Sequence, residues 1–371
     1  MALHFSRDTK VFLEQGGTVW EIPVLDGFSF SQATNASEIT LNEMTDTAGN
    51  SRRARQMFND SYAPAEWSFG SYMRPNAISG SSSGAVEEAL WANFIAANSW
   101  SSGTGWTSGV SYSAGNNTQA FDFGSSNKSV LGTFDLYFVM GAADESNSAA
   151  ATVGYTSNSS TTIYKIADCV ANEASMDFDI DGIATVNWSG FGKIIEDTAT
   201  FAGASAALAR SVGSTSNFIR NRLTSLSAVS AVSGTSRTYS LTLTGGNITM
   251  NNNMTYLTPE TLGVVNQPLG HVTGTRNIGG NFTCYLNTAT NASTQLFEDV
   301  IEATSTVTND FDLTFKIGGD SAPNVKVAMP NCHLEVPQHA IDDVVAVETT
   351  FHALPSDIDS ADEAVITYTG S

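Results

Sequence analysis

The chain contains one stretch of sequence twice. Residues 165–186 (KIADCVANEASMDFDIDGIATV) align without a gap on residues 326–347 (KVAMPNCHLEVPQHAIDDVVAV), and Lys, Ala, Ile, Asp and Val recur at matched positions. Four more pairs of blocks keep the same order: 134–141 with 311–318, 89–97 with 295–303, 69–73 with 282–286 and 39–41 with 248–250. Blocks that keep their order across spacers of different length indicate two copies of one domain in a single polypeptide.

Length and local composition place the boundaries of these copies. A chain of 371 residues is long enough for two domains that each bury a core. Residues 98–129 are rich in Ser, Gly, Asn and Trp, which predicts a surface insertion, and residues 198–217 are rich in Ala and Ser, which predicts a linker. We therefore expect a first domain over 1–197, a second over 218–354 and an acidic C-terminal tail over 355–371.

The charge balance excludes several classes of partner. The chain has 16 Lys and Arg against 37 Asp and Glu, a formal charge of −21, whereas tight wrapping of nucleic acid requires clustered Lys and Arg. Anionic membranes are disfavoured for the same reason, and no long apolar run predicts a membrane span. Cys169, Cys284 and Cys332 are an odd number without a C-x-x-C pair, which favours synthesis in a reducing cytosol.

The hydrophobic pattern is mainly that of β-strands. Short runs of Val, Ile, Phe, Tyr and Thr are separated by clusters of Gly, Asn and Ser. Strand-like runs flank Asp181-Gly182 within residues 176–188, which predicts a hairpin with a two-residue turn. Apolar residues at helical spacing predict one helix per copy, over 86–97 and 294–303. Each copy is therefore expected to be a β-sandwich or partly open barrel with one packed α-helix.

Two partial site motifs occur, and neither is complete. The DFDIDG run at 177–182 matches the first half of an EF-hand calcium loop, but the glutamate required at loop position 12 would be Trp188. The GSSSG run at 80–84 matches a hydrolase nucleophile elbow around Ser82, but the buried strand that must precede it is missing. The histidines show no metal-ligand spacing. We therefore expect no catalytic, cofactor-binding or metal site and no enzymatic activity.

One basic cluster stands out in this acidic chain. Arg52, Arg53 and Arg55 lie in a long connection between Leu41 and Trp67. Connections of that length in a compact domain usually have a function of their own. The cluster is either part of a solvated loop or a contact that docks onto an acidic surface of another copy.

Several segments resemble a known family. They are KVFL at 10–13, IPVLDGFSF at 22–30, EITL at 38–41, APAEWSFGSYMRP at 63–75 and AMPNC at 328–332, followed by the C-terminal hairpin. In these segments the chain resembles the tail tube proteins of long-tailed bacteriophages, which are related to the type VI secretion tube protein. The resemblance covers most of the chain and is weakest over 98–129 and 198–217.

The resemblance implies an assembly. Family members are β-sandwiches with one helix, whose edge strands pair with those of neighbours to close a ring, and whose rings stack through the long loop. Because one-domain members form hexameric rings, a two-domain chain is expected to form a homotrimer with pseudo-sixfold symmetry. The implied partners are further copies of the chain and other tail proteins, namely the tape measure, the terminator, the baseplate and, in a contractile tail, a sheath. The implied location is the virion tail, after synthesis in the host cytoplasm.

The implied function is a conduit through which double-stranded DNA passes from capsid to host without tight binding. An acidic wall suits passage, because like charge keeps the duplex from adhering. Asp177 and Asp179 alternate with Phe178 and Ile180, which are expected to face the core. Asp177 and Asp179 are therefore candidate lumen-facing acids.

Three alternative interpretations are open at this point. The first is another tail ring component of the same fold, such as a tail terminator or a baseplate hub, which should not polymerise into long tubes. The second is a duplicated β-sandwich adhesin that binds glycans, for which Trp91, Trp100 and Trp106 would supply aromatic contacts. An enzymatic interpretation rests on Ser82 alone.

Overall fold

The structure is a computed structural model in which most of the chain is described. The described residues are 3–39, 48–49, 56–78, 82–97, 100–101, 105–106, 108–113, 117–123, 131–141, 152–205, 217–230, 236–303, 311–340 and 344–370. They are mainly β-strand with two α-helices, which confirms the predicted fold class at this level. Within these ranges no helix is long and apolar enough to cross a membrane.

The strands of the first half pair antiparallel in one continuous order. In spatial sequence they are β3 (Ser29–Glu38), β4 (Met57–Tyr72), β14 (Thr185–Gly192), β13 (Thr162–Phe178), β11 (Phe134–Met140), β1 (Thr9–Gln15) and β2 (Thr18–Ile22). Buried and outward side chains alternate along them, as in β14, where Val186 and Trp188 are buried and Asn187 is exposed. The alternation arises because successive side chains of a strand point to opposite faces.

The strands of the second half pair in a similar order. They are β19 (Leu243–Asn251), β22 (Asn277–Tyr285), β26 (Ala346–Ala353), β24 (Asn324–Leu334), β23 (Phe311–Ile317), β17 (Ser225–Ser230) and β18 (Arg237–Ser240). A short strand after β24, β25 (Gln338–Ala340), also pairs with β26.

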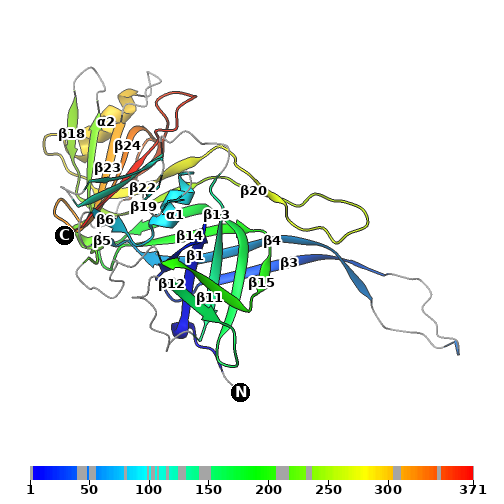
Figure 1. The fold of residues 1–371 in the computed structure, drawn as a ribbon. Coiled ribbons are helices and arrows are strands. Elements are labelled where there is room, and N and C mark those ends of the chain that lie inside the picture. Colours follow the sequence, from blue (N-terminus) through cyan, green and yellow to red (C-terminus); the bar gives the residue numbers. More distant parts are fainter. Residues whose placement is uncertain are drawn as a thin grey trace.

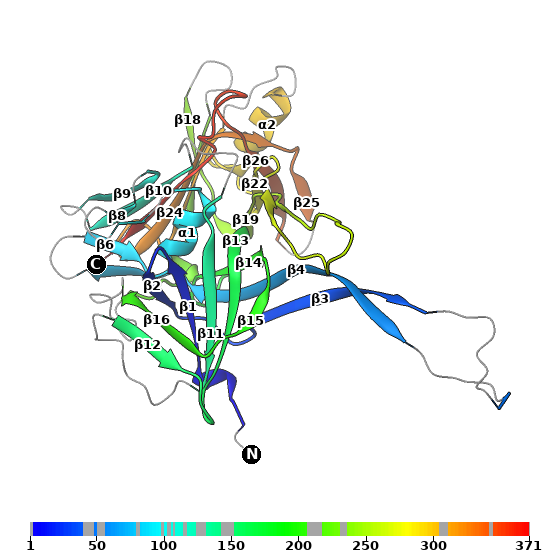
Figure 2. The ribbon, with the colours of Figure 1, turned by 45° about the vertical axis from the view of Figure 1, so that its right-hand side comes forward.

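The two halves join edge to edge. Residues 173–178 of β13 pair antiparallel with residues 246–251 of β19. Asn252, directly after β19, is buried, and its side-chain amide donates to the carbonyl oxygens of Phe94 (3.1 Å) and Ala171 (3.2 Å). Each such buried hydrogen bond stabilises the junction by about 1 kcal/mol. One sheet therefore runs from β3 through β13 and β19 to β25 (Figure 1; β25 is labelled in Figure 2).

The remaining strands extend this sheet or form small hairpins. The extending strands are β9 (Val110–Ser113), β10 (Thr118–Asp122), β12 (Thr152–Thr156), β15 (Ile195–Asp197), β16 (Thr200–Ser205) and β27 (Val365–Thr369). The hairpins are β5 (Pro75–Ile78) with β6 (Ser82–Ala85), β7 (Trp100–Ser101) with β8 (Gly105–Trp106), and β20 (Thr255–Leu257) with β21 (Gly270–Val272). The pairing of β16 with β2 is parallel, which makes the sheet mixed.

Residues 98–129, predicted to be a surface insertion, and residues 355–371, predicted to be an acidic tail, both contribute to the core. In the first segment Trp106 and Phe121 are buried, and in the second Tyr368 is fully buried. The reason is that β27 pairs with β10 on one side and with β24 on the other. The C-terminal strand thus ties the two halves together a second time.

Both predicted helices are present. α1 (Glu88–Phe94) lies within the predicted range, and every residue of it is buried. α2 (Ser293–Ala303) buries Leu296 and Val300, whereas Ile301 is exposed. The carboxylate of Asp299 in α2 accepts a hydrogen bond from the hydroxyl of Tyr239 (2.5 Å), which fastens the helix to β18.

The connection after β13 differs from the predicted two-residue turn. β13 and β14 do pair, but β13 ends at Phe178 and β14 begins at Thr185. Ile180, predicted to face the core, is 49% exposed. The reason lies in another segment, because residues 183–184 pair with residues 219–220 instead of with β13. The two-residue turn and the core position of Ile180 are therefore wrong.

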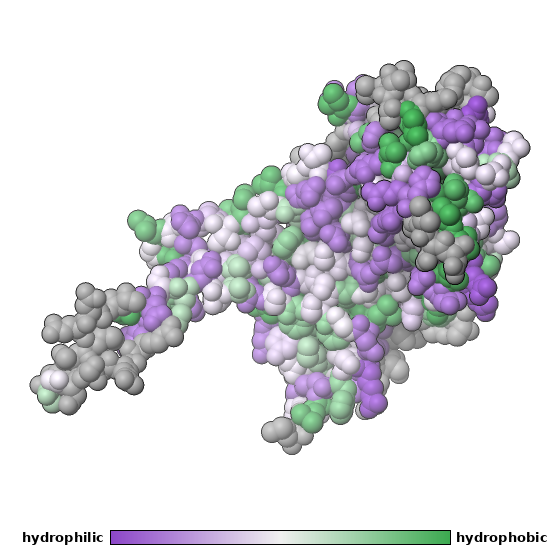
Figure 3. Space-filling view, turned by 180° about the vertical axis from the view of Figure 1, so that it is seen from behind, coloured by the Kyte–Doolittle hydropathy of each residue, from purple (hydrophilic) through white to green (hydrophobic). Residues whose placement is uncertain are grey.

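β3 and β4 continue beyond the body of the protein as a two-stranded arm (Figures 1 and 2). The segment 258–269, between β20 and β21, lies against this arm. The backbone N–H of Tyr62 donates to the carbonyl of Asn266 (2.9 Å), and the N–H of Asn266 donates to the carbonyl of Asp60 (3.1 Å). Hydrophobic patches alternate with hydrophilic ones on the projecting part in Figure 3. The exposed apolar side chains here include Met57, Phe58, Leu257, Leu262, Val264, Val265 and Leu269.

Candidate lumen surface

The sheet that runs through both halves has one apolar face. Phe69, Trp188, Ala174, Met250 and Ile278 lie side by side on neighbouring strands, and each is at most 3% exposed. Burying a large apolar side chain stabilises the fold by about 1.5–3 kcal/mol. A one-residue slip of any of these strands would turn its apolar set outward, so the core determines which side chains form the opposite face.

The opposite face carries short polar side chains and carboxylates. Ser68, Ser189, Glu173 and Asn251 form one row across four strands. The Asn251 side-chain amide donates to a carboxylate oxygen of Glu173 (3.1 Å) across the junction of the two halves. The polar and glycine residues of the face include Ser29, Ser31, Glu66, Ser68, Gly70, Glu173, Ser175, Asp177, Asn187, Ser189, Asn247, Thr249, Asn251, Asn277, Gly279, Asn281, Thr283, Glu348, Thr350 and His352. The half-buried Phe191, opposite Glu66, is a large apolar residue on the same face.

Cationic Lys and Arg side chains are absent from the described strands of this face. The stretches that pair with one another, 29–38, 57–72, 173–178, 185–192, 246–251, 277–285, 332–340 and 346–353, contain no Lys or Arg. The Nε2 atom of His352 lies 3.2 Å from a carboxylate oxygen of Glu335 at one end. The face is therefore polar and negatively charged from the first half to the second.

The structure separates the two aspartates that the sequence had grouped. Asp177 is exposed on the outward face of β13, as predicted. Asp179 lies beyond the end of that strand, and its side-chain oxygen accepts a hydrogen bond from the backbone N–H of Ile180 (2.6 Å). Both are exposed, but they do not share a strand. Arg52, Arg53 and Arg55 lie outside the described residues.

Sequence reasoning missed the other acids of the face. Glu66 and Glu348 each stand next to a buried apolar neighbour in an alternating strand, and so does Glu173. The alternation of apolar and polar residues in each strand predicts that these carboxylates point outward. The same alternation does not predict which strands lie side by side in one sheet.

A second acidic group is buried inside the protein. Glu88 accepts hydrogen bonds from the indole N–H of Trp20 (3.2 Å) and the side-chain amide of Gln119 (2.9 Å). Glu87 accepts one from the hydroxyl of Tyr368 in β27. Burial raises the pKa of Glu87 to about 7, and burial beside Glu87 raises the pKa of Tyr368. These carboxyls hold the start of α1 to strands of the core and do not reach the outward face.

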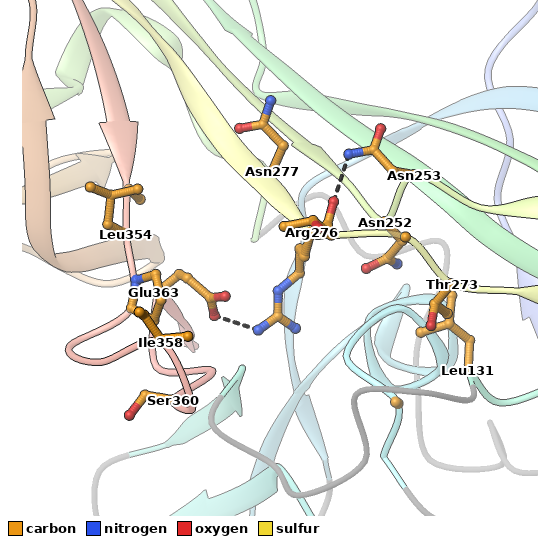
Figure 4. Close-up of a pocket in the computed structure, with 15 residues that line it drawn as sticks. Leu131, Asn252, Asn253, Thr273, Arg276, Asn277, Leu354, Ile358, Ser360 and Glu363 are labelled. Atoms are coloured by element: carbon orange, nitrogen blue, oxygen red, sulfur yellow. Dashed lines mark hydrogen bonds and ion pairs between the residues drawn. The ribbon is translucent and has the colours of Figure 1, made fainter.

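A cavity of about 550 Å³ lies between the start of β22, Asn252 and the C-terminal segment (Figure 4). The guanidinium of Arg276 forms an ion pair with Glu363 and donates to the carbonyl oxygens of Ala361 (2.9 Å) and Phe123 (3.2 Å). Through these contacts the guanidinium of Arg276 holds the C-terminal segment against the first half. Among the described residues, no three His, Cys, Asp or Glu side chains are grouped closely enough to hold a metal ion.

Comparisons with known proteins agree with the resemblance seen in the sequence. Residues 78–365 match the phage tail tube protein family. The chain is 30% identical to "Tail tube protein pb6" of Escherichia phage T5 over 382 aligned positions, which cover 99% of this chain and 76% of the relative. The chain belongs to the phage tail tube protein family. This tail tube protein is a structural, non-enzymatic component of the virion tail, of a kind that self-assembles into a tube.

The competing site predictions do not fit the geometry of this tail tube protein. Trp91 is fully buried and Trp106 is 5% exposed. The ring centroid of Trp100 lies 5.3 Å from that of Trp20, so the two rings pack together. A glycan-binding aromatic platform would have to be open to solvent, so the adhesin interpretation is wrong. Ser82 begins β6, which is antiparallel to β5, whereas a nucleophile elbow joins a parallel strand to a helix.

Proposed function

We propose that three copies of this tail tube protein form a ring, and that the rings stack into a tube whose lumen conducts DNA from capsid to host. The observation that carries the proposal is the continuous outward face, whose described strands contain no Lys or Arg. A duplex that slides along such a wall meets like charge, so it is not retained. A wall lined with Lys and Arg would instead bind the phosphates and release their counterions.

The proposal includes two tandem domains, with β27 of the C-terminal segment counted in the core of the second. The order β3-β4-β14-β13-β11-β1-β2 has its counterpart in β19-β22-β26-β24-β23-β17-β18. The register of β11 shifts after Phe134 and that of β23 after Phe311. Their partners Cys169 and Cys332 each direct a buried thiol to the carbonyl three residues earlier. Matched irregularities of this kind support a common origin of the two halves.

Two domains per chain reconcile the chain with a six-position ring, because three chains then fill it with pseudo-sixfold symmetry. We assign the contact between rings to the projecting arm. Met57 and Phe58 on it are each 58% exposed, and Leu262 on the attached loop is fully exposed. Covering such side chains with a neighbouring ring removes apolar surface from water. The other proposed partners are the tape measure, the terminator, the baseplate and, in a contractile tail, a sheath.

End-on class averages of the purified, assembled protein test the ring. We expect long tubes with true threefold and pseudo-sixfold symmetry. Six chains per ring, or a ring without a pseudo-sixfold signal, would contradict the stoichiometry. Single rings that never elongate would favour a terminator or baseplate component over a tube subunit.

Replacing Asp177 and Asp179 with Lys is expected to leave assembly intact and to slow DNA ejection. The effect should be largest at low ionic strength, where screening of the new cations is weakest. Ejection rates of phage carrying the variant, measured across a salt series, check this. The control is the double variant Asp320→Lys/Asp357→Lys, which makes the same change in net charge on exposed connections away from the face. Phage that carry this control should eject DNA at the wild-type rate. Unchanged ejection at every salt concentration would place the two aspartates outside the DNA path.

A further inference from the structure

Two histidines lie directly opposite each other on the outward face of the second half. His333 in β24 pairs with His352 in β26, and their ring centroids are 6.5 Å apart, with an angle of 21° between the ring planes. His333 is exposed, and the side chain of His352 is 43% exposed. The two imidazoles therefore form one open patch on a face whose described paired stretches contain no Lys or Arg.

The counterpart of this pair in the first half is Val170 opposite Phe191. Val170 and His333 each directly follow the cysteine that pairs with the phenylalanine at the start of an aligned strand. Each of them pairs in turn with the strand that follows, Val170 with Phe191 and His333 with His352. The two halves therefore place different chemistry at one matched position.

The matched position is covered in the first half. Val170, Met254 and Tyr256 belong to one buried apolar cluster, and the half-buried Phe191 packs against it. In the second half the same position is ionisable and open to solvent. A ring of three chains would thus carry three histidine pairs that alternate with three covered apolar pairs.

Space for a ligand lies beside His352. Its neighbour on the other flanking strand, β22, is Gly279, which has no side chain. A Cβ atom at Gly279 would lie 3.4 Å from Nδ1 of His352. Because glycine permits close approach of another group, this side of the imidazole stays accessible.

Glu335 is the described carboxylate in contact with the pair. One of its oxygens, Oε1, lies 3.2 Å from Nε2 of His352. The other acidic, basic or imidazole side chains of β24, β26 and the strands paired with them are Asp312, Lys316, Lys326, His339 and Glu348. Of these, Lys316 and Lys326 pair with each other at the far end of their strands, and His339 packs against Phe297. The segment after β26 adds Asp357, Asp359, Asp362 and Glu363, of which Glu363 is bonded to Arg276.

Protonation inverts the charge of the group formed by His333, His352 and Glu335. Imidazole gains its proton between about pH 8 and about pH 5. Neutral imidazoles leave the single negative charge of Glu335, whereas two imidazolium ions beside one carboxylate leave one net positive charge. Imidazolium donates from both ring nitrogens, and phosphate oxygens accept such charge-assisted hydrogen bonds.

We propose that His333 and His352 together form a phosphate-binding site when both are protonated, and that this site retains the DNA backbone inside the tube at low pH. The inference rests on the proposed function, which places this face on the DNA path, and it adds a condition under which passage is slowed. At neutral pH the same wall repels phosphate, so the duplex slides. Because cations that contact phosphates release counterions, retention must weaken as the salt concentration rises.

The histidine ring signals in nuclear magnetic resonance spectra of the purified, unassembled chain test the site. Isotope labelling restricted to histidine gives signals from five residues, and the single variants His333→Gln and His352→Gln assign two of them. Inorganic phosphate added at about pH 5.5 should shift these two signals saturably, and at about pH 8 it should leave them in place. In either single variant the remaining signal should shift several-fold less, because one imidazolium beside Glu335 carries no net charge.

Ejection rates of phage test the same site against DNA. At low salt the wild type should eject several-fold more slowly at about pH 5.5 than at about pH 8, and His333→Gln/His352→Gln should remove most of that difference. His333→Lys/His352→Lys keeps both cations at either pH and should eject slowly at both. The matched control His4→Gln/His339→Gln removes two exposed histidines outside the pair and should keep the wild-type pH dependence.

The two measurements separate failure of the site from failure of the proposed function. If phosphate shifts neither signal at about pH 5.5, the site is excluded and the proposed function stands. A pH dependence of ejection that persists unchanged in His333→Gln/His352→Gln would exclude retention of DNA by the pair. If phosphate binding requires both histidines but the wild type and both double variants eject at equal rates at every pH, the site stands and the face does not line the DNA path.

Discussion

Changing Arg52, Arg53 and Arg55 together to Glu is expected to abolish elongation of the tube while the chain still folds. The three residues form a basic cluster in a chain of formal charge −21, and in sequence they lie between the two strands of the projecting arm. We propose that they contact acidic groups of the neighbouring ring. Charge-assisted hydrogen bonds are stronger than neutral ones, and a network of them is worth more than isolated surface pairs. Reversing three charges replaces attraction with repulsion at every ring interface.

Electron microscopy of the purified variant measures this directly, with circular dichroism as the check on folding. The matched control is Arg7→Glu/Arg220→Glu/Arg222→Glu, which makes the same change in net charge at exposed positions outside the arm. That control should still form long tubes. Tubes of normal length from the Arg52, Arg53 and Arg55 variant would show that the cluster is only a solvated loop.

Glu87 is expected to make the protein less stable as the pH rises. Its carboxyl accepts a hydrogen bond from Tyr368, its other oxygen has no hydrogen-bond partner among the described residues, and the nearby Arg74 guanidinium is turned over the ring of Phe218 at 4.7 Å. Burial raises its pKa from 4.5 to about 7 in the folded chain. Between these values the folded state binds the proton more tightly than the unfolded state. The stabilisation is therefore complete below pH 4.5 and is lost as the pH rises through 7.

A shift of this size corresponds to about 3 kcal/mol in the free energy of unfolding between pH 4 and pH 8. Glu87→Gln keeps an oxygen that accepts from Tyr368 but cannot ionise. The variant and the wild type should therefore be similar at pH 4, and the variant should be more stable by up to about 3 kcal/mol at pH 8. Urea unfolding at a series of pH values measures the difference. Leu296→Ala, a buried truncation in α2, should cost about 3 kcal/mol at each pH and keep the wild-type slope. Parallel profiles for Glu87→Gln and the wild type would contradict the role of Glu87.

Features that depend on local residue pattern could be predicted from the amino-acid sequence. Alternation of apolar and polar residues gave the mainly β class, and apolar spacing located α1 and α2 to within a few residues. The quoted segments led to the tail tube family, which the comparisons confirm. The outward direction of Asp177 also followed, because side chains of a strand alternate between its faces. The tandem repeat and the trimer stay predictions.

Which strands pair with one another could not be predicted in this way, because it depends on the folded core. The pairing of β13 with β19, the route of β27 between β10 and β24, and the exposure of Ile180 all depend on segments far apart in the chain. Backbone hydrogen bonds carry no residue code, so a strand's partner is chosen by the apolar face that the finished core can bury. For the same reason the sequence could show single outward acids, but it could not show that Glu66, Glu173 and Glu348 line one surface.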